Sequence, residues 1–175
     1  ILSLSFLLIT PVFSQKRDIT LEDLWKNYSF YPKSYSGLNS MNDGEHYVKM
    51  EKTDGGQEII KYKFKSGKKT RTLFKSIDFK IPKIGKYTFS QDEKQLLLAT
   101  ETERIYRYSS KSIYYIYNLF TDKLQQLSDK KVMYATFSPK GDKIAYVLEN
   151  NLFIKNIRNG EITQVTIDGK KNHII

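Results

Sequence analysis

The stretch that decides the fold is Tyr87-Thr88-Phe89-Ser90-Gln91-Asp92-Glu93-Lys94, which recurs as Ala135-Thr136-Phe137-Ser138-Pro139-Lys140-Gly141-Asp142. Phe89 and Phe137 occupy the same place in the two copies, 48 positions apart. Each copy ends in residues typical of a tight turn and is followed by an apolar run. A unit that recurs at this spacing is typical of an architecture built from stacked structural repeats.

A third copy, Leu38-Asn39-Ser40-Met41-Asn42-Asp43-Gly44-Glu45, precedes the other two, and its Asp43 lies 49 positions before Asp92. Segments near the copies alternate apolar and polar residues, which is the pattern of half-buried strands. These segments are 46–50, 59–64, 95–99, 112–117 and 143–147. Turns that close the three units are expected at 65–68, 121–123 and 158–161.

Four short strands per unit predict the blades of a β-propeller. We expect an all-β fold, a partial β-propeller of about three four-stranded antiparallel blades at residues 35–75, 86–128 and 132–167. Thr20 is followed three residues later by Asp23, which is the spacing of a hydroxyl and a carboxylate at the start of a helix. This spacing predicts a short helix near residues 20–26. Because closed propellers have about four to eight blades, we expect residues 35–175 to be the first three blades of a longer protein.

The N-terminal residues 1–13 form an uncharged apolar run that is too short to cross a bilayer, which takes about 20 residues. The run fits the apolar part of a secretory signal peptide, with cleavage between Ser14 and Gln15. A buried N-terminal strand or helix is the alternative. We expect a signal peptide at 1–14, truncated at its start because it lacks a Met, then a helix and linker at 15–34. The mature protein is expected to be exported, periplasmic or extracellular, without a membrane span.

The composition narrows the chemistry that the chain can perform. It has no cysteine and only two histidines, which excludes disulfides and thiolate metal sites and disfavours a multi-histidine site, so no metal or cofactor is expected. Its 29 basic residues exceed its 19 acidic ones, and basic and aromatic residues interleave at 61–71. A lysine-rich solvent face of a strand produces the same pattern and protects sheet edges, so we expect no nucleic acid partner.

The second unit carries an insertion. From Phe89 to Asn118 it spans 29 positions, whereas the third unit spans 19 positions from Phe137 to Asn156. The ten extra residues lie between the second and third strands and include residues 101–110, which are charged and aromatic. A lengthened hairpin on a rigid scaffold is a common way to build a binding site. A solvated loop with alternating charges is the alternative.

The insertion resembles a known family. Glu103-Arg104-Ile105-Tyr106-Arg107-Tyr108-Ser109, leading into residues 113–119, is similar to the arginine-bearing extension of the dipeptidyl peptidase IV group of the prolyl oligopeptidase family. Residues 18–25 and 41–47 are similar to bacterial members, and residues 136–141 share a motif with many propellers. The resemblance covers residues 18–175.

The resemblance implies a secreted serine exopeptidase that releases N-terminal X-Pro or X-Ala dipeptides from a peptide substrate. The parent would have an eight-bladed propeller and a C-terminal α/β-hydrolase domain, and would form a homodimer. Arg107 matches the arginine that reaches a backbone carbonyl near the substrate's N-terminus, and Arg104 and Tyr108 are weaker candidates. Tyr108 stands where many relatives have His. Release of dipeptides or of tripeptides stays open, because both occur among relatives.

The chain is expected to hold no catalytic residues of its own. No G-x-S-x-G nucleophile motif occurs in it. The resemblance places the paired glutamates that bind the substrate's ammonium group after Ile175, so Glu101 and Glu103, in another blade, are not that pair. The alternative function is a non-catalytic periplasmic propeller that acts as a binding or scaffold module.

Overall fold

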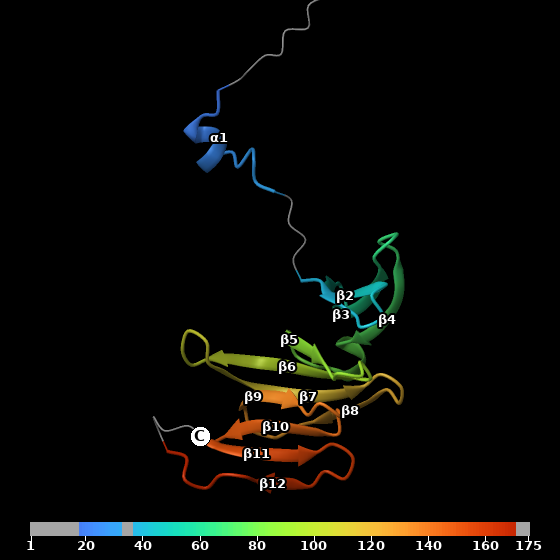
Figure 1. Cartoon of the computed structure of the whole chain (residues 1–175), viewed down its shortest axis with the longest axis vertical. Coiled ribbons are helices and arrows are strands. Elements are labelled where there is room, and N and C mark those ends of the chain that lie inside the picture. The colour runs from blue at the N-terminus through green and yellow to red at the C-terminus, as the bar shows by residue number, and fades with distance from the viewer. Residues whose placement is uncertain (1–17, 33–36, 171–175) are drawn as a thin grey trace, which may run out of the picture. The chain divides into compact units, whose positions relative to one another are not determined.

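The computed structural model describes residues 18–32 and 37–170 (Figure 1). The chain divides into two compact units, residues 1–36 and 37–175. The proposed signal peptide, residues 1–14, lies outside the described residues. In the first unit, helix α1 spans Leu21–Trp25, and its capping residue Thr20 accepts a hydrogen bond from the backbone N–H of Asp23 at 3.2 Å. The backbone N–H of Thr20 donates in return to the Asp23 carboxylate at 3.2 Å, which confirms the predicted helix start.

In the described residues the second unit is built of twelve strands, and neighbouring strands pair antiparallel. Blade 1 consists of β1 (Asn39–Ser40), β2 (His46–Thr53), β3 (Gly56–Lys63) and β4 (Lys69–Lys75). Blade 2 consists of β5 (Ile84–Phe89), β6 (Gln95–Arg104), β7 (Ser110–Asn118) and β8 (Lys123–Gln126). Blade 3 consists of β9 (Val132–Phe137), β10 (Lys143–Leu148), β11 (Asn151–Asn156) and β12 (Ile162–Gln164). A short 3₁₀ helix, η1 (Ile77–Phe79), connects blades 1 and 2. The predicted all-β fold with three four-stranded blades is confirmed.

Blades 2 and 3 are joined into one eight-stranded sheet, which the sequence did not predict (Figure 1). β8 pairs with the end of β7 only, from Tyr115 to Asn118. The start of β7 therefore has free backbone groups on that edge, and β9 pairs with them at Lys111 and Ser112. A strand edge that would otherwise stay open is covered in this way.

The turn residues explain why the repeat is visible in the sequence. In blade 2, the Ser90 hydroxyl donates to Asp92 at 2.7 Å and accepts from the backbone N–H of Gln95 at 3.0 Å. In blade 3, the Ser138 hydroxyl donates to Asp142 at 2.8 Å and accepts from the N–H of Lys143 at 3.1 Å. The recurring Ser thus plays the same part in both turns, although its Asp partner follows two residues later in blade 2 and four residues later in blade 3.

Apolar side chains on both faces of β6 form the core. Leu96 and Leu98 pack in a buried cluster with side chains of blade 1, whereas Leu97 packs in a second cluster with side chains of blade 3. Successive side chains of a strand point to opposite faces. A blade between two neighbours therefore has a continuous apolar run in its central strand, and this is why residues 96–99 are all buried.

Blades 1 and 2 are also joined by a buried amide. The Gln57 side chain accepts a hydrogen bond from the Ile84 N–H at 2.6 Å and donates to the Ile84 carbonyl at 3.1 Å. Gln57→Leu would leave both backbone groups unpaired, so we expect it to lower the free energy of unfolding by about 1–3 kcal/mol. Urea denaturation measures this loss, and Gln91→Leu, at an exposed position of the β5–β6 turn, is the control. Equal midpoints for the two variants would contradict the inter-blade role of Gln57.

Candidate functional site

The insertion of blade 2 forms a hairpin arm, defined here as residues 101–111. β6 has ten residues and β7 nine, whereas β10 and β11 have six each. The two long strands stay paired out to Arg104 opposite Ser110, so residues 105–109 alone form the connecting loop. Figure 1 shows the arm extending from the end of β6. The ten extra residues therefore lengthen a paired hairpin, and its residues 101–108 are all exposed to solvent.

A β-bulge lies at the base of the arm. Thr100 is opposite Ile113 and Glu103 is opposite Lys111, so β6 has one residue more than β7 between these pairs. Glu101 lies in the bulge with a φ of 49°, in the left-handed region that non-glycine residues seldom adopt. Bulges bend a strand and raise its twist. The arm therefore changes direction where it leaves the blade.

The tip of the arm is a four-residue turn that exposes Arg107 and Tyr108. Ser109 N–H donates to the Tyr106 carbonyl at 3.4 Å, and Tyr106 N–H donates to the Ser109 carbonyl at 3.1 Å. Arg107 and Tyr108 are the two central residues of this turn, and Tyr108 is 88% exposed. Both Arg107 and Arg104 are exposed, and neither has an ion-pair or hydrogen-bond partner for its side chain among the described residues. The arm thus presents two guanidinium groups that have no side-chain partner among the described residues, and Arg107 stands between Tyr106 and Tyr108 in the sequence.

One of the two acidic residues of the arm, Glu103, is paired with lysines. Glu103 forms ion pairs with Lys111 at 3.1 Å and with Lys131 at 3.6 Å. The hydrogen bond from Lys111, helped by the charge of Lys131, lowers the pKa of Glu103 despite some desolvation. Glu103 is therefore ionised at neutral pH and its charge is balanced, so the net positive character of the tip is preserved.

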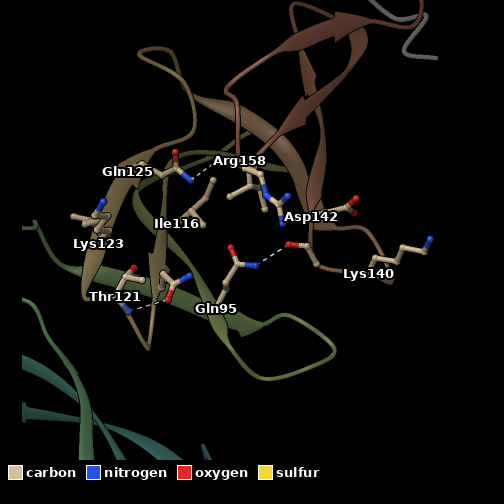
Figure 2. A pocket seen from close by; sticks show the side chains of 12 residues that line it. Gln95, Ile116, Thr121, Lys123, Gln125, Lys140, Asp142 and Arg158 are labelled. Atoms are coloured by element: carbon tan, nitrogen blue, oxygen red, sulfur yellow. Dashed lines mark hydrogen bonds between the residues drawn. The ribbon is translucent and has the colours of Figure 1, made fainter.

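A hollow lies at the ends of β6 and β7 that are opposite to the arm (Figure 2). It is a cleft of about 680 Å³ between the end of β7 and the turns of blade 3. The Gln95 side chain crosses from blade 2 to donate to the Gly141 carbonyl at 2.7 Å. Three cationic side chains and one carboxylate are among its lining residues: Lys123, Lys140, Arg158 and Asp142. No residue of the arm lines this cleft, and it offers no histidine and no hydroxyl paired with one.

A metal centre and a membrane-spanning helix are two other features that the described part of the chain could hold. There, no group of three or more His, Cys, Asp or Glu side chains could hold a metal ion. Among the same residues, no helix has the length and apolar character needed to cross a membrane. The arm therefore remains the candidate site within residues 18–32 and 37–170.

Residues 90–175, which include the whole arm, match the family model described as the dipeptidyl peptidase IV (DPP IV) N-terminal region. The chain carries a dipeptidyl peptidase IV-like N-terminal region. The crystal structure of Porphyromonas gingivalis dipeptidyl peptidase 4 is similar over 91% of this chain, with 36% identity and a TM-score of 0.69, and the match covers 23% of that chain. The resemblance seen in the sequence is confirmed.

Curated relatives agree with this assignment. The prolyl endopeptidase FAP of Bos taurus is 26% identical over 92% of this chain and 20% of its own length. A probable dipeptidyl-aminopeptidase B of Neurospora crassa is 33% identical over 46% of this chain and 9% of its own length. The chain thus spans a fifth or less of the length of these relatives.

Proposed function

We propose that this chain is the N-terminal propeller part of an exported serine exopeptidase that releases X-Pro or X-Ala dipeptides from the N-terminus of peptides. In this proposal the arm binds the substrate close to its N-terminus, and a C-terminal α/β-hydrolase domain supplies the nucleophile. The parent would act outside the cytoplasm, as a homodimer. The observation that carries the proposal is Arg107, which lies exposed and without a partner among the described residues, at the tip of an arm in a dipeptidyl peptidase IV-like region.

The chemistry of Arg107 suits a peptide backbone. A guanidinium group is always charged and presents five N–H donors in a fixed plane, while a carbonyl oxygen offers two lone pairs. A hydrogen bond from a charged donor is about twice as strong as one between neutral groups. By binding a carbonyl near the N-terminus, Arg107 would fix the distance from the substrate's end to the bond that is cleaved. Tyr108, next to it in the turn, could contact the same part of the substrate.

Arg104 is expected to contribute less than Arg107. It belongs to the last paired position of the arm, opposite Ser110, whereas Arg107 lies in the turn itself. We expect Arg104→Ala to lower kcat/KM of the complete protein by less than about threefold, within the range of a weak exposed charge interaction. Steady-state hydrolysis of a Gly-Pro chromogenic substrate measures this, and a loss as large as that of Arg107→Ala would contradict the lesser role of Arg104.

The activity itself is tested with the complete protein. We expect it to release Gly-Pro from Gly-Pro-p-nitroanilide, and to be inactivated by a serine-directed fluorophosphonate. A parallel assay with a chromogenic Ala-Ala-Pro substrate separates dipeptide from tripeptide release. If neither substrate is hydrolysed by the folded protein, the non-catalytic binding or scaffold module becomes the better account.

A further inference from the structure

We propose that Tyr134 and Lys131, near the start of blade 3, are positioning residues that hold the arm of blade 2 and thereby set where Arg107 lies. Neither residue belongs to the arm, and neither was singled out by its sequence. The structural part of this inference stands on contacts between the two blades. Its consequence for catalysis rests on the proposed function.

The first contact holds the tip of the arm. The Ser109 hydroxyl lies 3.0 Å from the Tyr134 hydroxyl. The carbonyl of the same Ser109 accepts hydrogen bonds from the N–H groups of Ile105, at 2.9 Å, and Tyr106, at 3.1 Å. Fixing Ser109 therefore fixes the turn whose central residues are Arg107 and Tyr108.

The second contact holds the base of the arm. The Glu103 carboxylate pairs with Lys111 on the opposite strand of the arm and with Lys131, which immediately precedes β9. One carboxylate thus joins both strands of the arm to blade 3. The backbone pairing of β7 with β9, Lys111 opposite Met133, lies directly beside this ion-pair group.

The backbone of β9 is distorted at the residue that makes the tip contact. Met133 is opposite Val147 and Thr136 opposite Ala145, so β9 has one residue more than β10 between these pairs. Tyr134 lies in this bulge with a φ of 54°. Bulges re-aim side chains, and non-glycine residues in the left-handed region are costly unless their surroundings fix them. The bulge therefore directs the Tyr134 hydroxyl to the arm.

These contacts matter because a free hairpin must lose conformational freedom when it binds a ligand. An arm that is already held in the binding conformation avoids that cost. If the competent position is populated only part of the time, the apparent affinity falls by the same fraction. Loss of the contacts with blade 3 should therefore raise KM for a peptide substrate and leave kcat nearly unchanged.

The order of the arm is measured without any substrate. Hydrogen–deuterium exchange of the complete protein, followed by mass spectrometry of peptides covering residues 101–111, reports the protection of the hydrogen-bonded amides. We expect exchange to be about 3 to 10-fold faster in Tyr134→Phe and in Glu103→Gln, and faster still in the double variant. Tyr31→Phe, whose hydroxyl has no hydrogen-bond partner among the described residues, and Glu149→Gln, which ends a surface ion pair with Lys130, are the matched controls. Unchanged exchange in the arm of both test variants would overturn the proposal.

Kinetics in two backgrounds separate this inference from the proposed function. In the otherwise wild-type protein, Tyr134→Phe should raise KM for Gly-Pro-p-nitroanilide about 3 to 10-fold with kcat within twofold. In an Arg107→Ala background it should have no further effect on KM, because the contact acts through Arg107. An equal rise in KM in both backgrounds would overturn the positioning role. If Arg107→Ala is itself without effect while exchange in the arm responds, the arm contacts stand and the proposed role of Arg107 falls.

Discussion

Replacing Arg107 by Ala is expected to lower kcat/KM of the complete protein on a Gly-Pro substrate about 10 to 150-fold. The change removes a charge-assisted hydrogen bond to the substrate, which contributes about 1.5–3 kcal/mol, and each 1.4 kcal/mol is a factor of ten. Arg107 has no partner of its own among the described residues, so its removal leaves no group of the described fold unpaired. The kinetic effect should therefore come without a loss of stability.

Two controls make this result specific. The free energy of unfolding of Arg107→Ala should differ from wild type by less than about 0.5 kcal/mol, as for other exposed substitutions. Arg107→Lys keeps the charge but loses the planar fork of donors, and it should recover only part of the activity. Unchanged kcat/KM in Arg107→Ala would show that the tip of the arm is a solvated surface.

The second prediction with a large expected effect concerns the stability of the core around β6. Leu97→Ala and Leu98→Ala are each expected to lower the free energy of unfolding by about 2–5 kcal/mol, because each leaves a cavity in a buried cluster. The two side chains lie on opposite faces of β6, in clusters shared with blade 3 and blade 1 respectively. In a sheet with one solvated face, one of the two replacements would be tolerated. Equal sensitivity of both positions is thus the energetic signature of a blade with neighbours on both sides.

Urea denaturation of the purified protein measures both losses. Lys86→Ala, at an exposed position of the neighbouring strand β5, is the control and should change stability by less than about 0.5 kcal/mol. A small effect of either Leu variant, similar to that of the control, would contradict the stacked-blade packing.

The fold could be predicted from the repeat because the interactions that form each turn and strand join residues close together in the sequence. Ser90 and Ser138 hold the same place in the turns of blades 2 and 3, and each hydroxyl donates to an Asp two or four residues later. Strand alternation and the capping pair of Thr20 and Asp23 also depend on residues close in sequence. Features of this kind can be read from a single sequence because the interacting residues are neighbours in it.

The surroundings of the arm could not be predicted in the same way. Ser109 and Tyr134 are 25 positions apart, and the contact between them depends on a bulge in β9 that places a tyrosine at positive φ. Nothing in the sequence around Tyr134 indicates a bulge, since neither Gly nor Asn is present there. The pairing of β7 with β9 likewise arises because β8 is short. The length of the insertion was predictable, but its direction and its supports were not.

The most direct test of the central claim asks whether Arg107 binds the carbonyl of the substrate's first residue. Wild type and Arg107→Ala are compared on Gly-Pro-p-nitroanilide and on its analogue in which that carbonyl is a thiocarbonyl, a much weaker hydrogen-bond acceptor. If Arg107 donates to this atom, the variant should lose about 10 to 150-fold in kcat/KM on the normal substrate and only a few-fold on the thio analogue. An equal loss on both substrates would contradict the account, because Arg107 would then act somewhere other than at that carbonyl.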